Sequence, residues 1–177
     1  MSVTLRLINL ERRAGHNDSV ESLYKTAMEK SLKTNAKAEL AVKFSRFLRL
    51  NLGQVSKARE ILNSILKIDE KNAKIHMQLL DIEMNAKPFD AENVIKVFDT
   101  SIATKGMPAR QKLLFSQRKI EFLEDFGTNT DEIQKAKVAH EKLMEEVKKE
   151  SKKEDVRGEN PIETIEGRSG KSKVIHF

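Results

Sequence analysis

The sequence predicts an all-α protein: tandem helical hairpins stack as an α-solenoid over residues 1–150, and a disordered, charged tail follows over 151–177. Three observations predict this. Apolar residues recur at helical spacing, turn and cap residues separate the helical segments, and residue classes repeat with a period near 37. Only 3 Pro and 7 Gly occur in 177 residues, so few positions interrupt helices. No segment keeps the two-residue alternation of a half-buried strand.

Eight amphipathic segments are the predicted helices. Each carries apolar residues along a stripe that repeats about every 3.6 residues, which is the spacing that one helix face requires. Leu40, Phe44 and Phe47 form one such stripe, and Val94 and Phe98 belong to another. In chain order the predicted helices cover residues 3–14, 18–32, 36–50, 54–68, 72–86, 91–104, 109–126 and 131–150.

Residues that end or begin helices lie between these segments. Glycine readily adopts the left-handed backbone that closes many helices, and Asn, Asp and Thr side chains cap the helix that follows. Proline is accepted where a helix begins. In chain order the breaks hold Gly15 with Asn17 and Asp18, Gly53 after Asn51, Asp69 to Asn72, Pro88 with Asp90, Gly106 with Pro108, and Gly127 to Thr130.

The helices form pairs, and the pairs repeat. Corresponding places in the first helix of each pair are separated by 37, 35 and 38 residues, and are held by Glu11, Leu48, Glu83 and Glu121. In the second helix, the separations are 38 and 36 residues between Tyr24, Leu62 and Phe98. A single hairpin cannot bury its apolar stripe, whereas stacked hairpins can, so this period predicts serial stacking. The alternative is an irregular helical bundle with accidental spacing.

Composition excludes several classes of function. The chain contains no Cys, which excludes disulfides, thiolate zinc sites and cysteine nucleophiles. No apolar run approaches the roughly 20 residues that a membrane helix needs, so we expect a soluble, intracellular protein without membrane contact. The net charge of +6 comes from 33 basic and 27 acidic residues. Because this charge is spread over body and tail, we expect RNA contact to be weak or indirect.

No catalytic or cofactor-binding motif is found. The four histidines, His16, His76, His140 and His176, lie far apart and lack the i, i+4 spacing of a helical metal site. Gly170-Lys171-Ser172 resembles the end of a phosphate-binding loop, but Ile165 stands where that loop needs Gly, and no strand precedes it. We therefore predict no enzyme activity, no cofactor and no metal.

The carboxylates of the seventh predicted helix are expected to form ion pairs within their own repeat. Glu121, Glu124 and Asp125 lie close in sequence to Arg118 and Lys119, and Arg118 and Glu121 are i, i+3 neighbours. Paired carboxylates can also act in acid–base chemistry, but only in a pocket that shifts their pKa values.

Several runs resemble the half-a-tetratricopeptide (HAT) repeat. Residues 58–62, Ala-Arg-Glu-Ile-Leu, are similar to the start of its second helix, and Ile82-Glu83 and Ile120-Glu121 to the end of its first. Residues 115–127, with the upstream runs 8–12, 79–83 and 93–99, resemble the C-terminal repeats of the pre-mRNA-processing factor 39 family. That resemblance covers roughly residues 5–147. The chain departs from the repeat pattern in having no Trp and in placing Leu48 where Glu is expected.

The resemblance implies a non-catalytic scaffold of nuclear pre-mRNA splicing. Such a protein associates with proteins of the U1 small nuclear ribonucleoprotein, aids 5′ splice-site recognition and forms a homodimer through its C-terminal repeats. Two alternatives stay open. One is a HAT-repeat scaffold in 3′-end formation or rRNA maturation, and the other is a tetratricopeptide-like peptide receptor with a basic carboxylate clamp in its groove.

The candidate surface for protein interaction or dimerisation lies on the last two predicted helices. Phe115, Phe122 and Phe126 share one broad helix face, with steps of 7 and 4 residues. The last helix either caps the array or is shared with a second subunit. The candidate surface residues are Phe115, Arg118, Phe122, Phe126, Ile133, His140 and Leu143.

The tail from 151 onward carries charge and no sustained apolar stripe, so we expect it to be disordered. Its basic residues, with Lys148-Lys149 before them, resemble a weak nuclear-import or RNA-contact signal. No aromatic residues are interleaved with them, which favours a solvated tail over base stacking. The last residues, Val174 to Phe177, form a short apolar segment that could dock elsewhere.

Overall fold

The computed structural model describes residues 2–127 and 129–158, and this part of the chain contains eight helices and no strand. Every predicted helix is confirmed, and the ends agree within two residues except at the last helix, which continues to Gly158. The helices are α1 (Ser2–Ala14), α2 (Asn17–Lys30), α3 (Thr34–Leu52), α4 (Val55–Leu66), α5 (Ala73–Met84), α6 (Ala91–Ala103), α7 (Ala109–Phe126) and α8 (Thr130–Gly158).

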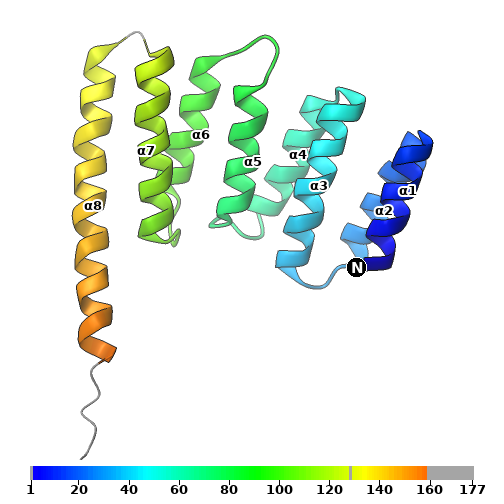
Figure 1. The fold of residues 1–177 in the computed structure, drawn as a ribbon, viewed down its shortest axis with the longest axis horizontal. Coiled ribbons are helices and arrows are strands. Elements are labelled where there is room, and N and C mark those ends of the chain that lie inside the picture. The colour runs from blue at the N-terminus through cyan, green and yellow to red at the C-terminus, as the bar shows by residue number, and fades with distance from the viewer. Residues whose placement is uncertain (1, 128, 159–177) are drawn as a thin grey trace, which may run out of the picture.

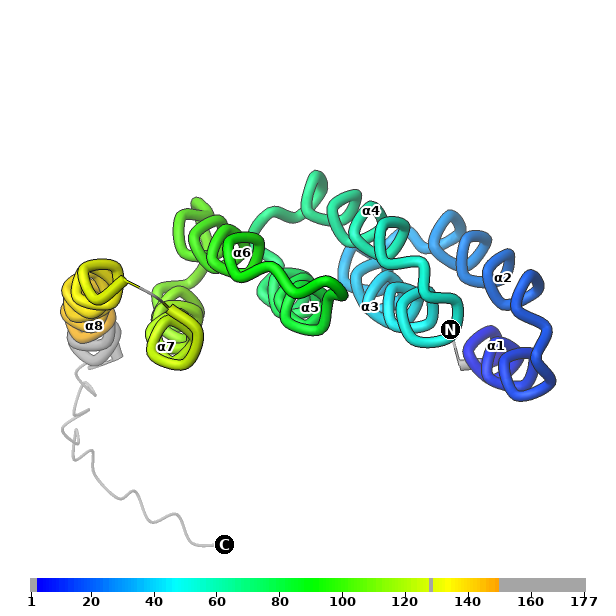
Figure 2. Tube along the Cα trace, turned by 90° about the horizontal axis from the view of Figure 1, so that it is seen from above, coloured from blue at the N-terminus to red at the C-terminus, as the bar shows by residue number. Residues whose placement is uncertain are grey.

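The helices stand side by side in chain order, from α1 at one end of the molecule to α8 at the other (Figure 1). Seen from above, α1, α3, α5 and α7 line one side of the row, and α2, α4 and α6 line the other (Figure 2). The row bends so that the odd-numbered helices lie on its concave side. Consecutive helices contact one another, and α3 also contacts α5. This serial stacking confirms the predicted solenoid and excludes a bundle around one centre.

Local chemistry explains where the helices end. Gly53 closes α3 with a left-handed backbone, φ 67°, and its amide donates to the Leu48 carbonyl; Gly15 and Gly106 also have positive φ. The Asp90 side chain caps α6 by accepting from the Glu92 amide at 2.9 Å. Two predicted caps are different. Asn17 and Asp18 lie in the first turn of α2, which no side chain caps, and the Asn72 side chain donates to Asp69 instead of capping α5.

The buried side chains form two clusters that meet at α5. The three residues that the repeat places in corresponding positions, Tyr24, Leu62 and Phe98, are at most 5% exposed. Ile75 and Leu79 belong to the cluster formed by α1–α5, whereas Leu80 belongs to the cluster formed by α5–α7. The core is therefore distributed along the stack, as repeat packing requires.

The α8 helix covers the end of the array. Its apolar stripe is half-buried along Ile133, Ala136, His140, Leu143 and Val147, and α8 packs against α7. His140 Nδ1 lies 3.2 Å from Ser116 Oγ on α7, and Lys137 pairs with Glu124 of α7 at 2.7 Å. The prediction that this helix caps the array thus agrees with its packing.

The tail predictions fall mostly outside the described part of the chain. The backbone is described to Gly158, and the helix therefore includes the first eight residues of the predicted tail. Residues 159–177 lie outside it, as do the side chains beyond Lys149. The proposals for the basic residues of the tail, for the Gly170-Lys171-Ser172 run and for the segment from Val174 to Phe177 stay predictions.

Candidate protein-binding groove

A groove of about 1330 Å³ runs along the concave side of the array. Three parallel helices, α3, α5 and α7, turn one face each toward it, because every second helix of the stack has the same orientation. The α6–α7 turn adds Gly106 and Pro108, and the ring of Phe98 on α6 lies at its floor. A smaller depression of about 520 Å³ lies beside the start of α4 and is also lined by Pro88 of the α5–α6 turn.

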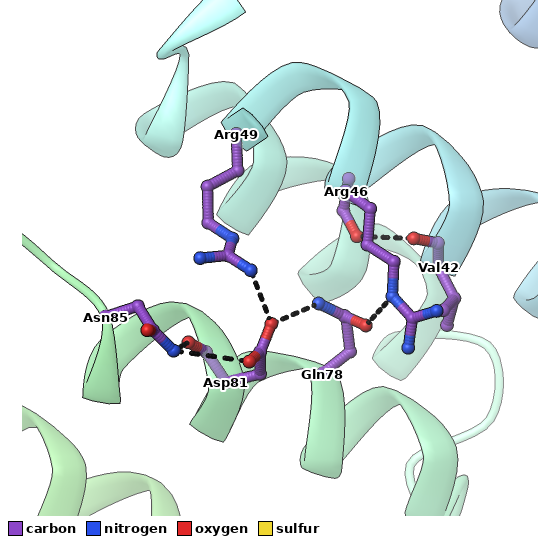
Figure 3. A network of polar contacts seen from close by, with 7 residues as sticks. Val42, Arg46, Arg49, Gln78, Asp81 and Asn85 are labelled. Carbon is purple, nitrogen blue, oxygen red and sulfur yellow. Dashed lines mark hydrogen bonds and ion pairs between the residues drawn. The ribbon is translucent and has the colours of Figure 1, made fainter. Parts of the chain in front are cut away.

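A polar network fixes the α3 and α5 walls of the groove (Figure 3). Arg46 Nε donates to Gln78 Oε1 at 2.7 Å, and Gln78 Nε2 donates to Asp81 Oδ2 at 3.1 Å. Arg49 Nη2 pairs with the same Asp81 oxygen at 2.8 Å, and Asn85 donates to the other at 3.2 Å. Because charge-assisted bonds have strict geometry, this network sets the spacing of the two helices. Both guanidinium groups are held by the protein itself.

The groove ends in an apolar cluster, which we call the aromatic end. Met84, Phe122 and Phe126 line the groove there, and Phe89 packs beside them against Phe122 and Phe126. Phe122 and Phe126 stack with their centroids 5.1 Å apart, and Phe89 lies 5.5 Å from Phe126. Phe122 also lies 5.9 Å from the buried ring of Phe98. Only 3% of Phe122 is exposed, against 45% of Phe89 and 53% of Phe126. The buried ring is thus a floor, and the other two rings form an accessible rim.

Acidic side chains flank the aromatic end. Glu121 and Asp125 both line the groove and are exposed. Glu121 accepts a hydrogen bond from Gln117 at 3.0 Å. One turn earlier, Arg118 is directed toward α5, with Nη1 3.4 Å from Met77 Sδ. Neither Glu121 nor Asp125 forms an ion pair within the described part of the chain, so both carboxylates stay available to a ligand.

The prediction of ion pairs within this repeat agrees with one of the two pairs that α7 forms in the described part of the chain, because α7 and α8 make up one hairpin. Lys119 pairs with Asp99 of α6 at 2.5 Å, and Glu124 pairs with Lys137 of α8. Both bonds join neighbouring helices, because each of these side chains points outward toward the next element. Glu124 and Lys119 of α7 therefore stabilise its packing against α8 and α6.

The structure divides the predicted surface residues into three groups. Phe115 is 0% exposed and packs edge-on against His76, and Phe122 is the buried floor of the groove, so both are core residues. The three candidates on α8 lie half-buried on the stripe that faces α7; they are Ile133, His140 and Leu143. Only Arg118 and Phe126 are exposed in the groove.

Sequence reasoning missed Phe89. This residue lies between a helix breaker and a helix cap, and the segment was interpreted as a turn alone. The sequence signal that could have identified Phe89 is a large aromatic residue that lies in a short turn and outside any apolar stripe. From the α5–α6 turn, its ring packs against Phe122 and Phe126 of α7.

Ion pairs also hold the α4–α5 junction. Arg59 donates two hydrogen bonds to Glu83, Nε to Oε1 at 2.6 Å and Nη2 to Oε2 at 2.7 Å. These bonds raise the pKa of the Arg59 guanidinium above its ordinary value. Only 8% of the Glu83 side chain is exposed. Glu83 occupies one of the corresponding positions of the repeat, and its role there is to join α5 to α4 through Arg59.

The three described histidines make structural contacts. His76 is 2% exposed, with Nε2 2.7 Å from the Glu70 carbonyl oxygen and Nδ1 3.0 Å from Ser101 Oγ. His16 lies against Glu11, and His140 against Ser116. No group of three or more potential His, Asp or Glu metal ligands occurs among the described residues. None of the helices in that part of the chain has the length and apolar composition needed to cross a bilayer.

Comparison with known proteins gives one consistent result. No protein-family model matches the chain. It is 36% identical over 143 residues to a Xenopus laevis protein named pre-mRNA-processing factor 39, and 32% identical over 162 residues to the Homo sapiens protein of that name. These matches cover 80% and 91% of the chain. They cover only 22% and 24% of the two relatives, so the chain spans about a quarter of their length. A Danio rerio protein of the same name is 30% identical over 122 residues, which cover 68% of the chain and 16% of the relative.

Proposed function

The chain belongs to the pre-mRNA-processing factor 39 family, and from this we propose that it is a non-catalytic scaffold of nuclear pre-mRNA splicing. The observation that carries the proposal is the groove on the concave side of a helical stack, in a chain whose relatives are named for pre-mRNA processing. The groove binds protein partners, and no chemical step is required of it.

The architecture suits a scaffold because its shape is fixed by contacts between helices. Arg46 and Arg49 tie α3 to α5, and Arg59 ties α4 to α5. A groove held open in this way binds without first ordering its own walls, which lowers the entropic penalty of association. Solenoids generally present such extended concave surfaces to partners.

Proteins are the proposed partners in preference to RNA. Acidic and basic side chains alternate along the groove, so it lacks the continuous basic surface that phosphate binding needs. The acidic members are Glu39, Asp69, Asp81, Glu121 and Asp125, and the basic members are Lys43, Arg46, Lys71, Lys74 and Arg118. Within splicing, association with proteins of the U1 small nuclear ribonucleoprotein and aid to 5′ splice-site recognition rest on the family resemblance.

The peptide-receptor alternative stays open beside the scaffold. A carboxylate clamp needs basic side chains that can meet a carboxylate; Arg46 is bonded to Gln78, whereas Lys43 and Lys74 line the groove and are exposed. A scaffold of 3′-end formation or rRNA maturation would share this fold, so the identity of the bound proteins is the property that separates it from a splicing scaffold.

We propose in addition that two copies form a homodimer through their C-terminal ends. The α8 helix runs antiparallel to α7 and extends well beyond the first turn of α7 (Figure 1), so its last turns have no neighbouring helix in the described part of a single chain. Light scattering on the purified chain distinguishes a monomer of 20.2 kDa from a dimer of twice that mass.

Affinity purification from nuclear extract tests the proposed function. The chain should retain spliceosomal proteins, including components of the U1 particle, and Arg118→Glu should reduce their recovery because it reverses a charge on the groove wall. Lys142→Glu, an exposed change on α8, is the matched control and should not. Recovery of 3′-end or ribosome-maturation factors instead, or of no spliceosomal protein, would refute the proposal.

A further inference from the structure

We propose that the aromatic end of the groove is a docking site for a linear segment of a partner protein in which a large apolar or aromatic side chain lies beside Lys or Arg. The inference rests on the proposed function only in that the groove binds proteins. It adds the chemistry of the ligand, which follows from the rings and carboxylates that meet there.

The rim rings supply the apolar part of the site. Phe89 comes from the α5–α6 turn and Phe126 from the end of α7, and each is about half exposed. A Phe side chain buries roughly 150–250 Å², so these two rings leave roughly 200 Å² of aromatic surface open. Met84, 47% exposed, extends this surface on the α5 side. Methionine beside aromatic rings adapts its shape to different apolar ligands.

The rings are held in place before any ligand arrives. Phe126 stacks on Phe122, which is packed against Phe98 in the core. Phe89 lies 6.3 Å from Phe122, so the turn that carries it is packed on the same floor. A site built on buried rings does not need to order itself, which favours binding of a short segment.

Charge selects the residues next to the apolar side chain. Glu121 and Asp125 lie within one turn of Phe122 and Phe126 on the groove-facing side of α7. The third carboxylate nearby, Asp81, is already paired with Arg49. The end of α7 also carries the negative pole of that helix, which attracts cations. Of the basic side chains nearby, Arg118 is directed toward Met77, and Lys87 lines the smaller depression beside the start of α4. The local field at the aromatic end therefore favours Lys or Arg in the ligand and opposes a phosphate backbone.

Peptide binding measured by fluorescence polarisation tests this assignment on the full chain. The probe is a fluorescein-labelled synthetic peptide, Gly-Ser-Arg-Lys-Phe-Ile-Lys-Ser-Gly-Ser. Two control peptides replace either Phe and Ile with Ser, or all three basic residues with Glu. An interface of this size is small, so we expect dissociation constants in the micromolar range for the probe.

Two substitutions in the site and two controls outside it separate the apolar and electrostatic contributions. Phe126→Ser should weaken probe binding at least tenfold, and Asp125→Lys should weaken it about threefold or more while strengthening binding of the Glu-containing peptide. Val138→Ser and Glu141→Lys, on exposed positions of α8, should stay within twofold of the unsubstituted chain. Because Phe126 is half exposed, the circular dichroism of its variant should be unchanged.

Three outcomes would overturn the proposal: equal binding by Phe126→Ser, equal binding of the peptide without Phe and Ile, or a dimer in light scattering that Phe126→Ser dissociates. The last result would mean that a second copy covers the rings. Success here with no spliceosomal protein recovered from nuclear extract would refute the proposed function alone. Recovery of those proteins without peptide binding would refute this inference alone.

Discussion

Replacing Phe122 with Ala removes the ring that joins the groove to the core. Phe122 is 3% exposed. The centroid of its ring lies 5.9 Å from that of Phe98, 5.1 Å from that of Phe126 and 6.3 Å from that of Phe89. Phe→Ala changes in protein cores lower the free energy of unfolding by about 3–5 kcal/mol. Since water can reach the vacated space from the groove, we expect the lower end, about 3 kcal/mol. For a chain of this size, that corresponds to a fall in melting temperature of about 6–12 °C.

Phe126→Ala is the matched comparison, four residues later on the same helix. Because 53% of Phe126 is already exposed, its loss should lower the free energy of unfolding by only about 1–2 kcal/mol. Urea unfolding followed by circular dichroism measures both variants. The two changes therefore separate a ring that stabilises the fold from a ring that is available to a ligand.

The position of the damage is a second, independent readout. Phe122 belongs to the cluster with Leu80, Val94 and Phe98, and the other cluster lies on the far side of α5. Stacked repeats open locally, so hydrogen exchange should accelerate in α6 and α7 while α2, α3 and α4 keep their protection. Equal loss of protection in α2–α4, or equal destabilisation by Phe126→Ala, would refute this account of the core.

Two further predictions concern ion pairs. Glu83→Gln should lower the free energy of unfolding, measured in urea, by about 1–3 kcal/mol, because it leaves Arg59 without its buried carboxylate. The control Glu60→Gln, at an exposed position, should change that free energy by no more than about 0.5 kcal/mol. Equal losses in the two variants would contradict the structure. The hydrogen bond from Lys25, at 2.8 Å, lowers the pKa of Glu21, with a smaller contribution from Lys57. The stabilisation from ionised Glu21 is therefore present above the ordinary Glu pKa of about 4.3 and is lost as the pH falls through the lowered pKa. In urea unfolding, the difference between the unsubstituted chain and Glu21→Gln should thus be larger at neutral pH than near pH 3, and a difference independent of pH would count against this.

Helix order was predictable because it depends on local periodicity. Apolar stripes place Tyr24, Leu62 and Phe98 in the core without knowledge of any neighbour. The length of α8 was underestimated for a related reason: its apolar stripe ends near Val147, but Lys and Glu keep a high helix propensity up to Gly158 without one. An apolar stripe indicates which helix face is buried, and a helical segment that projects into solvent can form without such a stripe.

The contacts between helices were not predictable from spacing alone. Arg118 and Glu121 have the separation of an intrahelical pair, yet Arg118 approaches Met77, and Lys119 reaches Asp99 on α6. The choice depends on which neighbour lies within reach, and that distance is set by stacking. For the same reason Phe115 could not be separated from Phe126 by sequence: both fall on one broad face, but only the former meets the buried His76.

The unequal joining of the three groove helices explains why the aromatic end is open. The α3 and α5 helices pack directly and share the network around Asp81. The α5 and α7 helices instead meet through the buried rings of His76 and Phe115, and Arg118 of α7 approaches Met77 Sδ of α5. Because α7 is spaced from α5 by α6, the floor ring of Phe122 is reached from the groove. One wall is thus fixed by charged bonds and the other by apolar contacts, and the rim rings of Phe89 and Phe126 stay about half exposed.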